Sequence, residues 1–265
     1  MTDPEQLTRA LCARLRTVSD GWHIDVCQRT GSTNSDLLAL RGDDRRVLCA
    51  LEQTAGRGRR GRDWTSAAGD SLTFSLRIRF SGRADRLAGL SLAVGVVLAE
   101  ALQQRGVDGL ALKWPNDLMR VRDGVPGKLG GVLIELLPAS THVDVVIGVG
   151  LNLAPPPPGD YAHPPVALFA GPPAEDDWLA TAGDLIAALI EALPRFADSG
   201  FAGFATRWEG FNLHAGRQVL VLGEQTTSEG RCVGVDVDGA LRLERDGVVS
   251  RVLSGDVTLR AANPA

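Results

Sequence analysis

The sequence of 265 residues contains almost no lysine, although it is rich in basic residues. Of its 28 lysines and arginines only Lys113 and Lys128 are lysines, while arginine, alanine and glycine are all abundant. This composition is typical of a codon bias rather than of one function. Because the planar arginine side chain cannot replace the compact lysine ammonium group at every site, the two remaining lysines are candidates for chemical roles.

Cysteine and histidine are also scarce, with four of each, and their spacing excludes two further classes of protein. The cysteines lie far apart and form no CxxC pair, which excludes a disulfide framework and gives no zinc-site pattern. The histidines show no metal-ligand spacing either. We therefore expect a cytoplasmic, reduced protein without a structural metal. The cysteines are Cys12, Cys27, Cys49 and Cys232.

No run of apolar residues reaches the ~18 residues of a membrane span, and the N-terminal segment has no apolar signal core. The net charge is −4, so the chain lacks the basic excess of dedicated nucleic-acid-binding proteins. We therefore expect neither a membrane nor DNA as a partner. With 44% hydrophobic and 23% charged residues, the chain can bury a sizeable core.

Apolar periodicity predicts an α+β fold in two parts. Residues 1–212 read as a larger α/β unit, and residues 213–265 as a small β-barrel with two Asp-Gly hairpin signals. Residues 120–127 are expected to form a turn, and the Pro-rich stretch 154–173 a surface loop. The expected helices are 4–17, 84–105, 175–192 and 196–210, with a short helix after residues 32–34 that supply its N-cap. The expected strands are 22–30, 46–53, 71–80, a short one ending before Pro115, a hairpin of 128–137 and 143–151, and five near 217–222, 230–237, 240–244, 247–253 and 256–260.

The sequence GRGRRG at 56–61 matches the dinucleotide-binding pattern GxGxxG letter for letter. That motif requires a strand before it and a helix directly after it, so that the helix N-terminus meets the pyrophosphate. Here RDWTSAAGD and then a strand follow, and the variable positions hold three arginines. We therefore exclude a Rossmann site.

Four arginines nevertheless lie within six residues, on a backbone that three glycines keep flexible. Guanidinium groups and free backbone N–H groups on such a loop can close around phosphate or carboxylate. The alternative is a solvated basic loop, although solvation alone does not require interleaved glycines. Trp64 after the loop either stacks on a purine or fills the base of the loop, and the sequence leaves both open.

Lys113 lies in KWPND, where Trp-Pro favours an extended backbone and a strand end carries an amide beside a carboxylate. This set suits a nucleotide, with the lysine on phosphate, Asn116 on base or ribose, and Asp117 near Mg²⁺. An ordinary turn is the alternative, because Pro-Asn-Asp is common in turns.

Lys128 begins an apolar strand that continues with Gly130-Gly131, and the partner strand carries Gly148 and Gly150 before Asn152. Glycines on two adjacent strands remove side chains from one patch of the sheet. Such a patch can hold a flat, mostly apolar small molecule with polar groups around it. A bulge or a twist explains either glycine pair alone, but explains both together less well.

In this order, GSTN (31–34), EQTAGRGRRGRDW (52–64), KWPNDL (113–118), KLGGVLIEL (128–136) and GVGLNL (148–153) closely resemble the catalytic core of biotin protein ligases. The terminal strands resemble that family's small C-terminal domain. The resemblance implies a mixed β-sheet catalytic domain flanked by helices, of class II synthetase type, in residues 1–212. It also implies an SH3-like β-barrel in residues 213–265.

The resemblance implies a two-step reaction with ATP, Mg²⁺ and biotin. The biotin carboxylate attacks the α-phosphate of ATP and gives biotinyl-5′-AMP and pyrophosphate. A lysine of an acceptor, the biotin carboxyl carrier domain of acetyl-CoA carboxylase, then attacks the mixed anhydride. Because two anions meet in the first step, positive charge at the site is chemically required.

Motif positions carry the expected roles over to single residues. Arg57, Lys113 and Lys128 are the candidate catalytic residues, with Lys128 bridging the biotin carboxylate and the α-phosphate. The implied biotin contacts are Ser32, Thr33, Asn34, Gln53, Gly56, Arg57, Gly58, Arg59, Lys128, Gly131, Gly148 and Gly150. The implied ATP contacts are Arg57, Arg59, Trp64, Lys113, Asn116, Asp117, Lys128, Asn152 and Arg260. We expect no metal site made of protein side chains alone, with Asp117 as the candidate contact to a Mg²⁺ on the ATP phosphates.

Two related functions are alternatives. Some family members carry an N-terminal winged-helix DNA-binding domain and act as repressors, but the residues before Trp22 are too few for one. Lipoate ligases share the fold but are not expected to carry GRGRRG together with KWPND. The Pro-rich stretch has no match in the family pattern, and the sequence leaves monomer and homodimer open.

Overall fold

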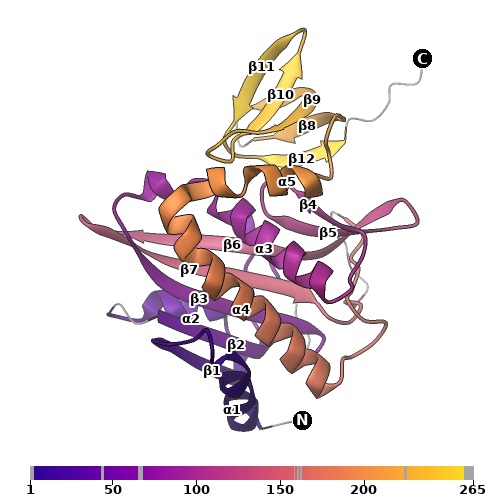
Figure 1. Cartoon of the computed structure of the whole chain (residues 1–265). Helices are drawn as coiled ribbons and strands as arrows, with labels where there is room; N and C mark the ends of the chain where they lie inside the picture. Colours follow the sequence, from indigo (N-terminus) through magenta and orange to yellow (C-terminus); the bar gives the residue numbers. More distant parts are fainter. Residues whose placement is uncertain are drawn as a thin grey trace.

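The computed structural model describes residues 3–42, 45–64, 68–157, 159, 161, 163–223 and 226–259. A seven-stranded mixed sheet forms the centre of the larger part, and a five-stranded antiparallel sheet forms the C-terminal part (Figure 1). The large sheet has the order β1 (Trp22–Thr30), β2 (Arg45–Gln53), β3 (Ser71–Ser81), β7 (His142–Asn152), β6 (Val125–Pro138), β5 (Asp117–Arg122) and β4 (Leu110–Lys113). Only β1 and β2 are parallel, so the predicted mixed sheet is confirmed.

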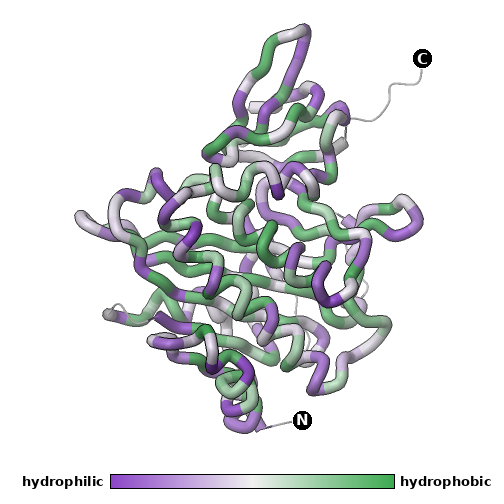
Figure 2. The backbone as a smooth tube through the Cα atoms, in the orientation of Figure 1, coloured by the Kyte–Doolittle hydropathy of each residue, from purple (hydrophilic) through white to green (hydrophobic). Residues whose placement is uncertain are grey.

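Helices cover one face of the large sheet and leave most of the other face for the site. The even-numbered residues of β3 face the helical layer, where Phe80 packs edge-on against Phe196 of α4 (Glu175–Ser199). The odd-numbered residues of β3 face α2 (Thr33–Ala39) on the other side of the sheet, where Ser75 contacts Asn34. Helix α3 (Leu90–Gln104) packs on α4, and α1 (Pro4–Leu15) packs on β1 and α4. Figure 2 shows the central strands and α3 as mainly apolar.

The segment 84–104 is, within the part of the chain that the structure describes, the one stretch long and apolar enough to cross a membrane. Of its most apolar 18-residue window, 67% is buried, and α3 packs on β6 and α4, so it is a core helix of this fold. The expected single helix 84–105 is wrong in one detail, because a 3₁₀ turn η2 (Ala84–Leu87) precedes α3. Gly89 separates them with φ 77°, and a Cβ there would lie 2.5 Å from Phe201 Cβ.

Two other boundaries differ from the expectation. The expected break between helices 175–192 and 196–210 is absent, because α4 continues through Pro194 to Ser199. Its buried apolar stripe extends to Phe196, so packing outweighs the lost backbone hydrogen bond. The chain then forms η3 (Gly200–Gly203) and α5 (Ala205–Phe211). The expected turn 120–127 is only Asp123-Gly124, both at positive φ, between β5 and β6.

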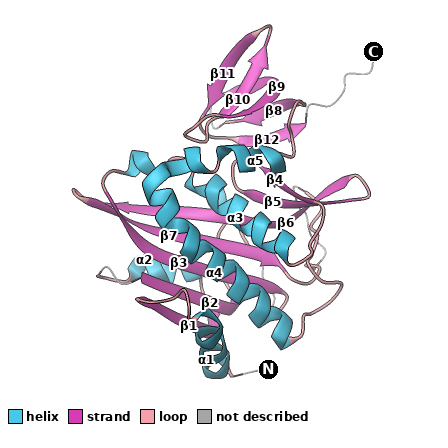
Figure 3. Ribbon diagram, in the orientation of Figure 1, coloured by secondary structure: helices cyan, strands magenta, loops and turns pink. Residues whose placement is uncertain are grey.

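The C-terminal sheet has the order β11 (Val248–Val252), β10 (Leu241–Arg245), β9 (Thr227–Val235), β8 (Gln218–Leu222) and β12 (Asp256–Leu259). Asp246-Gly247 forms the predicted hairpin between β10 and β11, with both residues at positive φ. Figure 3 shows this all-strand part beside α5. The α+β class is therefore confirmed, and the change of sheet lies between Phe211 and Gln218.

Candidate active site

A pocket of about 400 Å³ opens on the sheet face opposite α3 and α4. Segments that lie far apart in the sequence meet there: the start of α2, the loop after β2, the β4–β5 turn, β6 and β7. Fifteen of the predicted site residues line it, namely Ser32, Thr33, Asn34, Gln53, Arg57, Gly58, Arg59, Trp64, Asn116, Asp117, Lys128, Gly131, Gly148, Gly150 and Asn152. Gly56 and Lys113 lie behind this lining, and Arg260 lies outside the described residues.

The pocket floor is made of glycine backbone, as the sequence predicts. Gly131 of β6 lies directly opposite Gly150 of β7, and Gly148 lies opposite Leu133. A Cβ on Gly131 would have its nearest neighbours 3.6 Å away, so only a ligand needs that space. A Cβ on Gly148 would lie 2.2 Å from Asn34 Oδ1, so this glycine makes room for the polar end of the pocket.

Gly130 serves another purpose than Gly131. A Cβ on Gly130 would lie 2.6 Å from the carbonyl oxygen of Gly150 and 3.1 Å from Leu151 Cδ1. Close packing between strands therefore requires the first glycine of the pair. Of these two neighbouring glycines, only Gly131 belongs to the floor of the pocket.

One end of the pocket is polar, and a chain of hydrogen bonds fixes its groups. The Thr33 backbone N donates to Gln53 Oε1 at 2.8 Å, and the Thr33 and Ser75 hydroxyl oxygens lie 2.7 Å apart. The Ser75 hydroxyl donates to Asn34 Oδ1 at 2.6 Å, which sets the orientation of that amide. Asn34 Nδ2 then donates to Glu135 Oε2 at 2.8 Å. This end suits a small polar head group that needs both donors and acceptors.

Ser32 begins α2 as its N-cap, with extended backbone and its hydroxyl accepting from the Ser35 N–H at 3.5 Å. The sequence offers Ser32, Thr33 and Asn34 as caps of a helix that begins at residue 35; in the structure Ser32 is the cap, and the helix begins two residues earlier, at Thr33. Ser32, Thr33 and Asn34 are all buried. Capping therefore places the three residues at the polar end of the pocket.

The Gly/Arg loop, residues 56–64, folds back on itself beside the pocket. The Trp64 N–H donates to the Gly56 carbonyl at 2.9 Å, and the Gly58 N–H donates to the Arg62 carbonyl at 2.6 Å. A Cβ on Gly56 would lie 2.5 Å from the Trp64 oxygen, so this turn needs glycine. The next element that the structure describes after the loop is strand β3, whereas a Rossmann turn leads directly into a helix.

Trp64 lies on the glycine floor. A Cβ on Gly150 would lie 2.5 Å from Trp64 Cε2, so the indole occupies the space that a side chain would take. Its Nε1 is buried and has no hydrogen-bond partner among the described residues. The indole therefore forms one wall of the pocket, with a buried N–H that no described protein group there satisfies.

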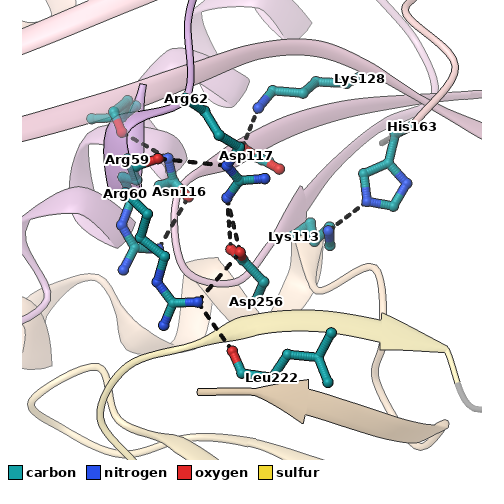
Figure 4. Close-up of polar contacts among 11 residues, drawn as sticks. Arg59, Arg60, Arg62, Lys113, Asn116, Asp117, Lys128, His163, Leu222 and Asp256 are labelled. Atoms are coloured by element: carbon teal, nitrogen blue, oxygen red, sulfur yellow. Dashed lines mark hydrogen bonds and ion pairs between the residues drawn. The ribbon is translucent and has the colours of Figure 1, made fainter. Parts of the chain in front are cut away.

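Carboxylates anchor the arginines of the Gly/Arg loop at both ends of the pocket. Arg57 Nη2 binds Glu135 at 3.0 and 2.8 Å, on the same carboxylate that holds Asn34. Arg62 Nη2 binds both oxygens of Asp256 at 2.9 Å, and Arg60 Nη1 lies 3.5 Å from the same carboxylate (Figure 4). Asp256 belongs to β12, so the C-terminal sheet holds the loop.

The opposite end of the pocket gathers positive charge. Lys128 Nζ binds Asp117 Oδ1 at 2.7 Å, and Arg59 Nη1 donates to Asn116 Oδ1 at 3.4 Å. Asn116 is itself fixed, because its Nδ2 donates to the Val132 carbonyl at 2.9 Å. Burial lowers the pKa of Arg59. A partly buried guanidinium beside an ammonium group forms a strong anion site.

Lys113 lies behind this end, 7% exposed, and its Nζ is 2.5 Å from His163 Nε2. Burial lowers the pKa of Lys113, while the carboxylates of Asp117 and Asp256 oppose that effect. Burial, followed by the charge of Lys113, lowers the pKa of His163. The histidine comes from the Pro-rich stretch, which the sequence predicts to be only a surface loop.

Comparison with known proteins gives matches over both parts of the chain. Residues 26–152 match the biotin/lipoate A/B protein ligase family, and residues 214–260 match the biotin protein ligase C terminal domain. The bifunctional ligase/repressor BirA of Escherichia coli is 36% identical over 259 residues, covering 92% of this chain and 76% of that protein. The chain belongs to the biotin protein ligase family. The biotin–[acetyl-CoA-carboxylase] ligase of Paracoccus denitrificans is 31% identical over 224 residues, covering 81% of this chain and 91% of that protein.

Solved structures agree with the fold of this biotin protein ligase. The biotin protein ligase from Aquifex aeolicus in complex with biotin and ATP superposes with a TM-score of 0.72 at 27% identity. The match covers 91% of this chain and 99% of that chain. It includes the C-terminal sheet as well as the large sheet, so the two-part architecture is that of a biotin protein ligase.

The site of this ligase also contains residues that the sequence motifs do not indicate. Glu135 lies within KLGGVLIEL but reads there as an ordinary strand residue. Ser75 sits in an alternating strand, and Asp256 in a terminal strand. These three residues are revealed only by their hydrogen bonds to Asn34 and to Arg62. The Pro-rich stretch, in addition, contributes four residues to the pocket lining, namely Pro156, Tyr161, His163 and Pro165.

Proposed function

We propose that the chain activates biotin with ATP as biotinyl-5′-AMP and transfers it to a lysine of a biotin carboxyl carrier domain of acetyl-CoA carboxylase. The observation that carries this proposal is the layout of one pocket. A flat glycine floor leads from a neutral polar end to a cluster of lysine and arginine side chains. Biotin has the matching layout, with a polar ureido ring, a flat apolar body and a carboxylate.

In this orientation the ureido group of biotin lies at the polar end, where Gln53, Thr33 and Asn34 offer fixed donors and acceptors. The rings lie on Gly131, between the Asn34 side chain that covers Gly148 and the Trp64 indole that covers Gly150. The carboxylate then reaches Lys128. These roles follow the family resemblance, and the bound structure reported for the Aquifex aeolicus relative supports the choice of ligands.

The first step joins two anions. A biotin carboxylate oxygen attacks the α-phosphorus of ATP, the new P–O bond forms, and the bond to the β-phosphate bridging oxygen breaks to release pyrophosphate. Lys128 and Arg59 supply positive charge where the two reactants meet, which reduces their repulsion and stabilises the charge of the transition state. Arg57 adds to this charge once it leaves Glu135, which binds it at the polar end of the pocket in the free chain. Fixed orientation of both reactants in the pocket supplies much of the remaining acceleration.

In the second step the neutral amine of the acceptor lysine attacks the acyl carbon of the mixed anhydride. The C–N bond forms, the bond between the acyl carbon and the phosphate oxygen breaks, and AMP leaves while the amine loses a proton. A mixed anhydride hydrolyses readily, so the site has to exclude water until the acceptor arrives. The Gly/Arg loop is the segment we assign to that cover, because Arg57 and Arg59 line the pocket.

We assign Mg²⁺ to the nucleotide rather than to a protein cage. Within the described ranges there is no group of three or more His, Cys, Asp or Glu side chains that fits a metal ion. Asp117 is a carboxylate of the pocket lining, and it already binds Lys128. Bound to the phosphates, the ion would neutralise charge on ATP, with Asp117 as its one candidate contact from the protein.

Several expectations remain predictions. These are the absence of DNA binding, the cytoplasmic location, the choice between monomer and homodimer, the domain boundary at 212/213 and the contact of Arg260 with ATP. A mobility-shift assay on a biotin-gene promoter tests DNA binding, since several relatives are named ligase/repressor.

The test of the function uses the full chain, ATP, Mg²⁺, a carrier domain and either labelled biotin or labelled lipoate. We expect one biotin on one carrier lysine by mass spectrometry and no labelling by lipoate. A carrier variant with that lysine changed to arginine is the matched control. Labelling by lipoate but not by biotin would contradict the proposal.

A further inference from the structure

The Pro-rich stretch does not simply cross the surface, because residues 163–168 are hydrogen-bonded to the strands under the pocket. The Lys128 N–H donates to the Pro164 carbonyl at 2.8 Å, and the Val166 N–H donates to the Lys128 carbonyl at 2.9 Å. Asn152 Nδ2 donates to the carbonyls of both Lys128 and Val166, at 3.2 and 3.1 Å. The stretch is therefore fixed in one register beside β6.

The sequence of this stretch suits such a fixed path. Pro164 and Pro165 have no N–H group that would need a partner, and the residue before a proline is restricted to extended conformations. Gly127 leaves room for the segment, since a Cβ there would lie 2.2 Å from Val166 Cγ1. The backbone of His163 is thus held where its ring reaches Lys113 Nζ, at 2.5 Å (Figure 4).

The two lysines of the chain have chemically different partners. Lys128 binds the Asp117 carboxylate, which offsets its positive charge. Lys113 binds an imidazole nitrogen, and a neutral imidazole with its proton on Nδ1 accepts a hydrogen bond through Nε2. A neutral acceptor orients the ammonium group without itself cancelling its positive charge.

We propose that His163 is a positioning residue that holds the Lys113 ammonium group at the phosphate end of the pocket and so sets the affinity for the ATP phosphates. This inference rests on the proposed function, since it assigns a role within the same site. It adds a residue that the family motifs do not contain.

The charges around His163 agree with a neutral ring at neutral pH. Lys113, Lys128 and Arg62 disfavour a second positive charge on the ring, and Asp117 favours it. His214 also faces this group. Burial and the charge of Lys113 lower the pKa of His163, so the ring takes up its proton only below its ordinary value. Protonation removes the acceptor and places two cations side by side, which weakens the position of Lys113.

The test measures the Kd for ATP alone by calorimetry, and the KM values for ATP and biotin, for His163→Ala, His163→Gln and the wild type. We expect His163→Ala to weaken ATP binding about tenfold, the loss typical of a hydrogen bond to a charged group, with the KM for biotin and the melting temperature little changed. His163→Gln should restore most of the affinity at pH 7.5, because its amide oxygen accepts from Lys113 without titrating. His23→Gln, at an exposed position on β1, is the matched control.

The pH dependence separates positioning from a merely structural role. As the pH falls below about 6.5, the wild type should lose affinity for ATP, and His163→Gln should keep it. Unchanged ATP binding in His163→Ala, equal losses in both variants, or the same acid dependence in the wild type and His163→Gln would each overturn the inference. A chain that binds ATP but activates no biotin overturns the proposed function instead, while the Kd values still decide the role of His163.

Discussion

Lys128 Nζ and Asp117 Oδ1 form an ion pair of 2.7 Å at the point where the glycine floor meets the positively charged end of the pocket. The lysine side chain is 30% exposed and that of the aspartate 13%, so the pair faces the pocket rather than the core. An anionic ligand that reaches this point must share the lysine with the carboxylate. The pair thus holds Lys128 in place before the reactants bind.

Lys128→Ala should therefore cut formation of biotinyl-AMP by at least about 100-fold, because it removes charge stabilisation where the two anions meet. Lys128→Arg should also fail, because the planar guanidinium cannot take the place of the compact ammonium group. Single-turnover formation of the adenylate measures both, with the melting temperature as the check on folding. Near-normal turnover in Lys128→Ala would refute its catalytic role.

The glycine floor allows a pair of variants that separates ligand space from protein packing. Gly131→Ala should raise the KM for biotin about tenfold or more at unchanged stability, because its Cβ has 3.6 Å of clearance from protein atoms but enters the ligand's space. Gly148→Ala should lower stability by about 1–3 kcal/mol, because its Cβ would meet Asn34 Oδ1. Gly210→Ala, with open space around its Cβ, is the control. Equal effects of Gly131→Ala and Gly210→Ala on the KM would contradict the floor assignment.

Glu135 joins the polar end of the pocket to the Gly/Arg loop. Removing its carboxylate leaves Arg57 without this anchor and leaves Asn34 Nδ2 with the longer hydrogen bond to the Leu133 carbonyl, at 3.4 Å. Because Arg57 is 44% exposed, the ion pair contributes about 1 kcal/mol or less. Glu135→Ala should therefore raise the KM for biotin by no more than about five- to tenfold.

Arg57→Ala should release free biotinyl-AMP faster than the wild type, because the loop loses a group that lines the pocket. The release assay also distinguishes the role of Arg57, which covers the intermediate, from that of Glu135, which anchors Arg57. Glu135→Ala should therefore speed the release less than Arg57→Ala does. Glu52→Ala, which breaks the exposed pair with Arg29, is the control. Unchanged release in Arg57→Ala would mean that the loop does not cover the intermediate.

Asp256 links the C-terminal sheet to the Gly/Arg loop through Arg62 and Arg60. Asp256→Ala should loosen this loop in the free chain, because two arginines lose their common partner. Trypsin cleaves after arginine, so limited proteolysis within 57–62 should be faster in the variant. Glu244→Ala, which breaks a pair with Arg231 inside the C-terminal sheet, should leave cleavage unchanged. Equal cleavage of both variants would contradict this link.

His214 should make the fold sensitive to acid. It is 6% exposed, and burial, followed by the charges of Lys113, Arg217 and His163, lowers its pKa from 6.5 to about 4. Between these values the unfolded chain binds more protons, so stability falls as the pH drops through this range, by up to about 3 kcal/mol. Urea unfolding at several pH values should show a smaller fall for His214→Gln. If stability fell equally with pH in the wild type and in His214→Gln, His214 would not be the cause of the acid sensitivity. His23→Gln is the control for the loss of an exposed histidine.

The sequence supports the fold and the floor because both depend on local patterns. Alternation and glycine positions predict the β6–β7 hairpin, and pairing within it brings Gly131 opposite Gly150. A helix N-cap within residues 32–34 follows in the same way from residue types next to each other, although the choice of Ser32 does not. Such features need no knowledge of distant segments.

The features that escape prediction depend on tertiary register. His163 meets Lys113 only because the Pro-rich stretch pairs with Lys128, and no periodic pattern encodes that pairing. Asp256 reaches Arg62 only because the two sheets lie against each other. Helix α4 passes through Pro194 because its apolar stripe is buried, which local propensity cannot anticipate.

The most direct test of the proposed activation of biotin is exchange of labelled pyrophosphate into ATP, measured without an acceptor. The wild type should catalyse exchange that depends on biotin and is not supported by lipoate, and Lys128→Ala should abolish it. Exchange that needs lipoate, or no exchange with biotin under conditions where the chain is folded and binds ATP, would contradict the account.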